Sequence, residues 1–144
     1  MPSNEKEIIE DLVEKCTEDK ELYYFVSKLL ENKSIRRVCE NNAHLKEQAI
    51  EKLVKNAPTK EPIKIKRSAM NDVKKVKCLL SSLISLNGDR SILSTLEKIE
   101  RHSVDKFKSA MTKTTNKNVQ KLIKENIPYV EQTKQSIDNI MQTY

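Results

Sequence analysis

Apolar residues recur at intervals of three and four along almost the whole chain, and this spacing constrains the fold more than any other feature. The period matches the 3.6 residues per turn of an α-helix, so each segment carries one apolar stripe on one face. Glycine, which interrupts helices, occurs only once in 144 residues, and charged residues make up 33% of the chain. The pattern therefore predicts an all-α protein with long helices rather than turn-rich β structure.

The stripes and their interruptions predict five helices in a single domain over residues 1–144. Prolines 58 and 62 disfavour helix between the second and third stripes, because proline lacks an amide donor and restricts the residue before it. The expected helices lie at about residues 5–31, 35–56, 68–86, 90–111 and 118–142, and the main linker at 57–67.

The third expected helix is shorter and more uniformly apolar than the other four, as a segment packed across a bundle would be. Residues 57–88 are long enough to return along the whole bundle, which sets the second and fourth helices parallel. We therefore expect a ferritin-like four-helix bundle with an additional crossover helix between bundle helices 2 and 3.

Side chains that favour helix ends mark several of these boundaries. Asn4, Ser34 and Asp89 are the expected N-caps of the first, second and fourth helices, and Ser68 is expected to open the third. The pair Asn87-Gly88 is expected to end the third helix in a left-handed turn, which glycine adopts at little cost.

The run 88–100 resembles the third bundle helix of a small bacterial branch of the ferritin-like superfamily, a family of unknown function. The resemblance consists of Gly-Asp, an Ile-Leu pair, two glutamates three apart and an aromatic residue seven positions later; here the glutamates are Glu97 and Glu100 and the aromatic is Phe107. Residues 5–142 can all be laid along the plan of that family. A histidine common in its last helix falls on Lys134. The resemblance implies a ferritin-like fold and raises the question of a di-iron or di-manganese site.

Inward polar positions show how much of such a metal site the sequence retains. Ferritin-like sites take a glutamate from two helices and a Glu-x-x-His from each of the other two. Here Glu40 and His44 do not form Glu-x-x-His, and the last helix has Glu131-x-x-Lys134 instead. We therefore expect no complete metal site, only degenerate positions. The stripes place the following residues inward or one turn from an inward position: Asp19, Asn42, Ala43, Glu97, Glu100, Thr133 and Lys134.

Two interpretations of this polar layer are open. Asp19 or Glu100 pairs with Lys134 across the bundle, or the buried acid reaches water through a kink that Pro128 introduces into the last helix. In both, the layer is structural.

Nothing in the sequence identifies a catalytic constellation. The three cysteines, Cys16, Cys39 and Cys78, form no Cys-x-x-Cys pair and lie on apolar stripes, so we interpret them as small buried hydrophobic residues. We interpret His44 and His102 as partly exposed helix residues. Glycine-rich phosphate-binding loops are absent. We expect no enzymatic activity and no cofactor.

The net charge of +6 is concentrated in one segment, residues 60–77, which carries seven cationic against two acidic residues, a balance of +5. A solvated lysine face explains it, and so does an anionic partner. Arginine is scarce there and no aromatic residue is interleaved, so we expect at most weak, nonspecific nucleic-acid binding. The possible anion or partner contacts are Lys60, Lys64, Lys66, Arg67, Lys74, Lys75 and Lys77.

These observations favour a cytoplasmic protein-interaction or structural module. The first residues are polar and do not follow the plan of a signal peptide, and no apolar stretch is long enough to span a membrane. The alternative is a divergent metal-binding or stress-related ferritin-like protein. We expect an unknown protein partner, and apolar residues on more than one face of helix 68–86 permit a homodimer.

Overall fold

The computed structural model describes residues 5–64, 70–86 and 88–144, with the backbone alone for residues 70–72. Within these residues the regular secondary structure is α-helix, and none of them lies in a β-strand. The helices are α1 (Glu5–Leu29), α2 (Lys33–Lys55), α3 (Met70–Ser85), α4 (Asp89–Lys113) and α5 (Lys117–Met141). The prediction of an all-α chain is confirmed. No helix in this part of the chain is both long and apolar enough to cross a membrane.

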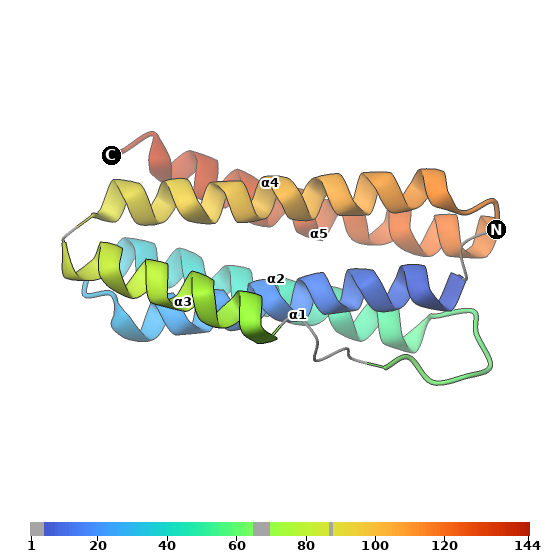
Figure 1. Ribbon diagram of the computed structural model, residues 1–144. Helices are drawn as coiled ribbons and strands as arrows, with labels where there is room; N and C mark the ends of the chain where they lie inside the picture. Colours follow the sequence, from blue (N-terminus) through green and yellow to red (C-terminus); the bar gives the residue numbers. More distant parts are fainter. Residues whose placement is uncertain (1–4, 65–69, 87) are drawn as a thin grey trace.

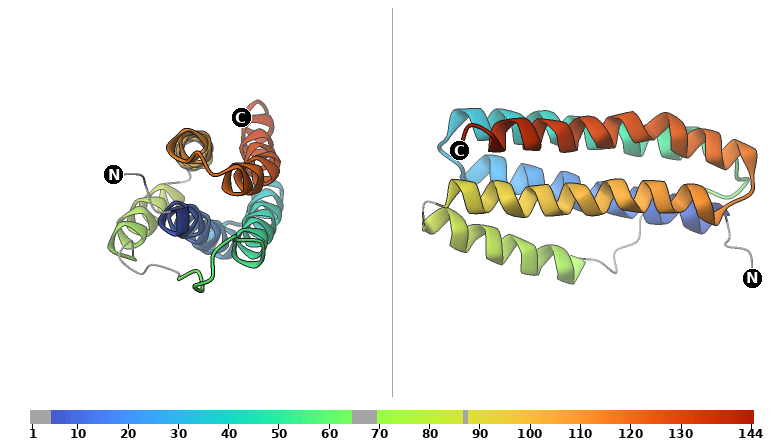
Figure 2. Two further views of the ribbon diagram at one scale, coloured as in Figure 1. Left: turned by 90° about the vertical axis from the view of Figure 1, so that its right-hand side faces the viewer. Right: turned by 90° about the horizontal axis from the view of Figure 1, so that it is seen from above.

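Four long helices lie side by side, and α3 packs on the outside of α1 and α4 (Figure 1). In the end-on view the order around the bundle is α1, α2, α5 and α4 (Figure 2). α1 and α5 run in one direction, whereas α2 and α4 run in the other. The chain between α2 and α4 therefore returns along the bundle, and α3 forms part of that return.

The apolar core has two halves, one toward each end of the bundle. One half joins the first part of α1 to the ends of α2 and α4 and the start of α5; its larger members include Ile9, Leu12, Leu53, Phe107 and Ile123. The other half joins the remaining parts of these helices to α3; its members include Leu22, Val26, Ile35, Leu80 and Leu93. Buried polar side chains from all four long helices lie between these halves.

Two of the expected N-caps are wrong. α2 is capped by Asn32, whose side-chain oxygen accepts a hydrogen bond from the Ile35 amide at 3.1 Å, and not by Ser34. α4 has Gly88 at its N-cap position, and Asp89 is its first helical residue. Asn32 ends the α1–α2 connection earlier than expected because its side chain reaches the first turn of α2 directly.

Gly88 has a φ of −90°, so the left-handed turn expected at this residue is wrong. Its amide donates to the Leu83 carbonyl at 2.9 Å and closes the end of α3. A Cβ at this position would lie 3.1 Å from the same carbonyl oxygen. The glycine is therefore explained by the close approach of this carbonyl and not by a left-handed backbone. The expected roles of Asn4, Ser68 and Asn87 concern residues outside the described ranges.

Candidate functional site: a buried ion-pair layer

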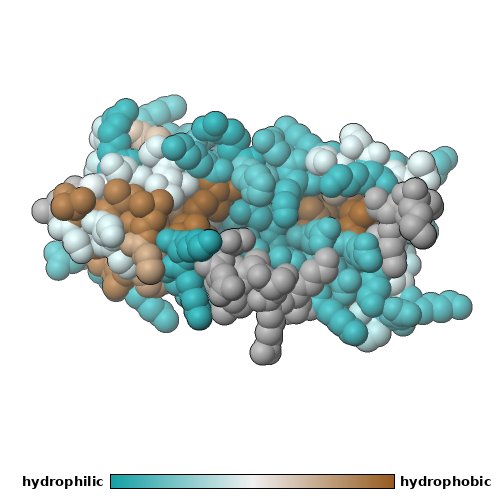
Figure 3. All heavy atoms as spheres, viewed as in Figure 1, coloured by the Kyte–Doolittle hydropathy of each residue, from teal (hydrophilic) through white to brown (hydrophobic). Residues whose placement is uncertain are grey.

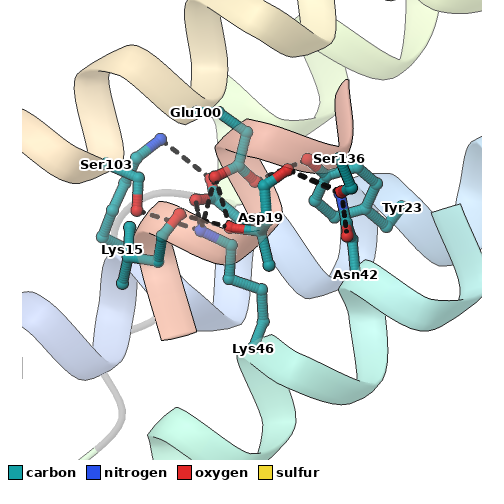
Figure 4. A network of polar contacts seen from close by, with 10 residues as sticks. Lys15, Asp19, Tyr23, Asn42, Lys46, Glu100, Ser103 and Ser136 are labelled. Carbon is teal, nitrogen blue, oxygen red and sulfur yellow. Dashed lines mark hydrogen bonds and ion pairs between the residues drawn. The ribbon is translucent and has the colours of Figure 1, made fainter. Parts of the chain in front are cut away.

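A connected set of polar side chains crosses the middle of the bundle, and we call it the polar layer (Figure 4). It contains residues from α1, α2, α4 and α5, and most of these side chains are buried. Its members are Lys15, Asp19, Tyr23, Asn42, Lys46, Glu100, Ser103, Thr133 and Ser136.

Lys46 forms the centre of the layer. Its Nζ lies 3.2 Å from Asp19 Oδ2 and 3.1 Å from Glu100 Oε2, and its side chain is only 1% exposed. The same ammonium donates a hydrogen bond to the Ser103 hydroxyl at 3.1 Å. One cation on α2 therefore bridges a carboxylate on α1 and another on α4.

Asp19 is held by charge rather than by hydrogen bonds of ordinary geometry. Lys15, one turn earlier on α1, places its Nζ 2.9 Å from Asp19 Oδ1, while Lys46 approaches Oδ2. Neither carboxylate oxygen accepts a hydrogen bond of acceptable geometry from any described group. The layer thus contains two carboxylates and two ammonium groups, so its charges balance.

Glu100 is more fully hydrogen-bonded. The Tyr23 hydroxyl donates to its Oε1 at 2.5 Å, and the Thr133 hydroxyl donates to its Oε2 at 2.7 Å. Together with the Lys46 ammonium, these donors satisfy a carboxylate that is completely buried. Because the donors come from α1, α2 and α5, Glu100 connects α4 to the other three long helices.

Asn42 extends the layer toward the end of α5. Its Nδ2 donates to the Thr133 carbonyl at 3.1 Å, and the Ser136 hydroxyl donates to its Oδ1 at 2.7 Å. Both halves of the amide are therefore used between α2 and α5. Such two-sided pairing fixes the axial register of the two helices, because sliding either by one residue would leave buried polar groups unsatisfied.

The environment of the layer determines the protonation of its groups. Burial opposes the charge on Lys46, but Asp19 and Glu100 outweigh it and raise the pKa of the ammonium. Burial, and then the charge of Glu100, raises the pKa of Tyr23 well above its usual value, so the hydroxyl stays a donor. Burial also raises the pKa of the neighbouring Cys16 thiol to about 12, despite the attraction of Lys46.

The layer does not fit a di-metal centre of the kind that the ferritin-like resemblance implies. Such a centre uses four carboxylates and two imidazoles. The layer supplies only the carboxylates of Asp19 and Glu100, and the Lys46 ammonium lies between them. A divalent cation there would be repelled by that ammonium. Within the described residues, no group of three or more His, Cys, Asp or Glu side chains is placed to hold a metal ion.

The expected role of Lys134 is wrong. Its Nζ pairs with Asp138, one turn further along α5, at 2.7 Å, and both side chains are 31% exposed at the rim of the bundle. Thr133, the preceding residue, takes the inward position instead. Glu97 also lies outside the layer, where it pairs with Arg101 on the same helix.

The predicted burial of the cysteines and exposure of the histidines can be compared with the structure. Cys16 and Cys39 are buried, as predicted, whereas Cys78 is exposed on α3 and that part of the prediction is wrong. His44 and His102 are exposed. The pKa of His102 is lowered, first by its partial burial and then by Lys15 and Lys106.

Sequence reasoning missed Lys46, although a signal for it was present. The α2 stripe passes from Ala43 to Ala49, and Lys46 lies three residues from each, in the middle of the buried face. A lysine flanked at these spacings by fully buried alanines has room for its methylene chain to run inward. Tyr23 lies on the apolar stripe of α1, so periodicity indicates a core side chain but does not reveal that its hydroxyl donates to Glu100.

Part of the basic segment 60–77 lies in the described residues. Lys60, Lys64, Lys74 and Lys75 are exposed, whereas Lys66 and Arg67 lie outside the described residues. The backbone amide of Lys64 donates to Glu10 of α1 at 2.7 Å, and Lys6 pairs with Glu61 at 2.9 Å. These contacts hold the loop after α2 against the first half of α1.

Two surface features lie at α3. Leu79 on α3 and Leu86, which directly follows the helix, are 50% and 78% exposed. Apolar spheres gather over this end of the molecule (Figure 3). Between α1 and α3 there is also a groove of about 570 Å³, lined by Lys20, Glu21, Tyr24, Phe25, Lys28 and Lys77.

Comparisons of the chain with family models, with curated proteins and with solved structures find no significant match.

Proposed function

We propose that this chain is a protein-interaction or structural module on a ferritin-like scaffold, without enzymatic activity, in which the polar layer stabilises the bundle. The position of the Lys46 ammonium carries this proposal, because it lies between the Asp19 and Glu100 carboxylates. The charged groups of the layer are engaged with one another, so the surface rather than the interior is available for binding. The parallel directions of α2 and α4 support the ferritin-like part of the proposal.

The interaction surface that we propose is the exposed side of α3. This helix packs on the outside of α1 and α4, and it leaves Leu79 and Leu86 in contact with solvent beside the exposed Lys74 and Lys75. A single exposed leucine needs no explanation. Two exposed leucines at the end of a peripheral helix, one in its last turns and one directly after it, next to a basic segment, support a surface that a partner covers.

Site-specific photo-crosslinking in the producing cells tests this surface. A photoreactive amino acid replaces Ser82, which is exposed between the two leucines, and, as a matched control, Gln132, which is exposed on α5. We expect a discrete adduct from position 82 that disappears when Leu79→Ser and Leu86→Ser are added. Absence of an adduct, or the same adducts from both positions, would overturn the proposed surface. An adduct of twice the chain mass would assign the surface to a second copy.

Elemental analysis separates the proposal from the metal-binding alternative. The chain is produced with added iron or manganese and purified without chelator. We expect far less than one metal ion per chain, because Lys15 and Lys46 already neutralise the two buried carboxylates. A stoichiometric metal content would instead support a divergent metal-binding ferritin-like protein.

A further inference from the structure

We propose that the groove between α1 and α3 binds an acidic protein segment that carries a large apolar side chain, such as one face of an acidic amphipathic helix. This inference rests on the proposed interaction function and adds a second surface to it, because Lys77 faces α1 in the groove whereas Leu79 faces solvent. It is based on the shape of the groove, on its aromatic rings and on the lysines around it.

The groove has an apolar floor. Phe25 and Tyr24 are partly buried and pack against the core half that includes α3, so each ring leaves part of its surface in the groove. The remaining space, about 570 Å³, is large enough for a bulky side chain of a partner. Burying an apolar side chain on these rings would remove apolar surface from water and so favour a complex.

Lysines surround this floor on both helices. Lys20 and Lys28 lie on α1, and Lys77 lies on α3 with Lys74 one turn before it. Against these four cations stand Glu21 and Glu47, which leaves a local balance of +2.

The existing ion pairs at the groove are long. Lys77 lies 3.6 Å from Glu21, and Lys20 lies 3.9 Å from Glu47. Neither Lys28 nor Lys74 has an ion pair with another described residue. A partner carboxylate can therefore approach these lysines without breaking a short internal pair, and charge complementarity would guide its approach.

The same observations disfavour other occupants. The carboxylates of Glu21 and Glu47 would repel a phosphate backbone, which carries a charge at every nucleotide. A second copy that presented the same groove would set lysines against lysines. Neither objection applies to a partner that presents a few separate carboxylates beside one apolar side chain.

Binding of synthetic peptides tests the inference. The probe is a fluorescent helical peptide with leucines spaced by three and four residues and glutamates elsewhere, and its controls are a scrambled peptide and a version with glutamine for glutamate. We expect fluorescence anisotropy to show binding of the probe that is weaker for both controls. An oligothymidine strand forms the nucleic-acid arm, and we expect it to bind less tightly than the probe.

Charge reversal locates the site on the protein. In a Lys28→Glu/Lys77→Glu variant the dissociation constant should rise at least about tenfold, because two attractions become repulsions. A Lys117→Glu/Lys124→Glu variant carries the same charge change on exposed residues of α5 and should bind as the parent does. Thermal unfolding followed by circular dichroism confirms that both variants fold.

The outcomes separate this inference from the proposed function. Equal binding of the scrambled peptide, equal loss in both charge variants, or tighter binding of oligothymidine would overturn the acidic partner. The crosslink at position 82 does not depend on the peptide. If that crosslink persists while the peptide experiment fails, the interaction function stands and its partner is of another chemistry; if the crosslink fails, the interaction function fails as well.

Discussion

A lysine ammonium inside a helical bundle is costly to desolvate, and Lys46 keeps its charge because two carboxylates lie within 3.2 Å. The two carboxylates, Asp19 and Glu100, are not held in the same way. Glu100 receives hydrogen bonds from Tyr23 and Thr133, whereas Asp19 has ion pairs only with Lys15 and Lys46 among the described residues. Removing Lys46 would therefore affect Asp19 most.

We predict that Lys46→Ala destabilises the protein strongly and that Lys134→Ala does not. Breaking a fully buried pair leaves uncompensated charge and costs about 3–5 kcal/mol, whereas the half-exposed Lys134–Asp138 pair contributes less than about 1 kcal/mol. The measurement is the free energy of unfolding from urea titration of both variants.

A Lys46→Met variant serves as the control for packing. Methionine fills most of the space of the lysine chain but leaves Asp19 with Lys15 alone, so we expect the variant to stay well below the parent in stability. Equal losses for Lys46→Ala and Lys134→Ala would contradict the assignment of Lys46 as the central cation.

The sequence predicted that polar residues face inward in the middle of the bundle, but it did not predict all the residues that form the contacts there. Asp19, Asn42, Glu100 and Thr133 are inward, as their stripes predicted. The α5 stripe allowed either Thr133 or Lys134 to face inward, because spacings of three and four both fit a helix. The short hydroxyl side chain fits beside Glu100, and the lysine remains at the rim.

At the scale of elements, polar caps decide where the helices begin. Asn32 accepts a hydrogen bond from the Ile35 amide, and its Nδ2 also donates to Asp89 at 3.4 Å and to the Tyr144 hydroxyl. One side chain thus joins the starts of α2 and α4 to the end of the chain. The cap of α5 is similar, since Asn116 accepts from two amides of the first turn.

We predict that Asn32→Ala lowers the free energy of unfolding by about 1 kcal/mol or more, the usual cost of losing an N-cap. Ser34→Ala should change it little, because Ser34 is exposed and lies inside α2. Thermal unfolding of both variants checks this. A larger loss of stability for Ser34→Ala than for Asn32→Ala would show that Ser34 is the N-cap of α2, as the sequence suggested.

The helices themselves could be predicted from periodicity, because each buries a long apolar stripe. Their caps could not, since Asn32 and Ser34 are both good cap residues two positions apart. The choice depends on Ile35, which is completely buried and fixes the rotation of α2. That constraint comes from packing between helices and is not visible in a local pattern.

For the whole molecule, the polar layer separates two apolar halves and connects all four long helices. Groups that hold their protons more tightly in the folded state gather near it. Burial raises the pKa of Cys16 and of Cys39 to about 12, and it raises the pKa of Tyr23 well above its usual range. The carboxylates raise the pKa of Lys46 despite burial. All four shifts have the same sign.

We predict from these shifts that stability falls as the pH rises above about 9, where the thiols of an unfolded chain lose their protons. Between that pH and the folded values near 12, the unfolded state binds fewer protons than the folded state, so the free energy of unfolding decreases with pH. Lys46 follows the same rule: its contribution is fully present below the unfolded value of 10.5 and is lost as the pH rises through the higher folded value.

Urea unfolding at a series of pH values from about 7 to about 10.5 measures this slope, which for each such group approaches about 1.4 kcal/mol per pH unit. The double variant Cys16→Ala/Cys39→Ala is expected to be less stable at neutral pH, because both side chains are completely buried, but to lose less stability between pH 8 and 10. The two thiols would then account for the difference in slope. A free energy of unfolding that stays constant or rises over this range in the parent would contradict the burial of these groups beside the layer.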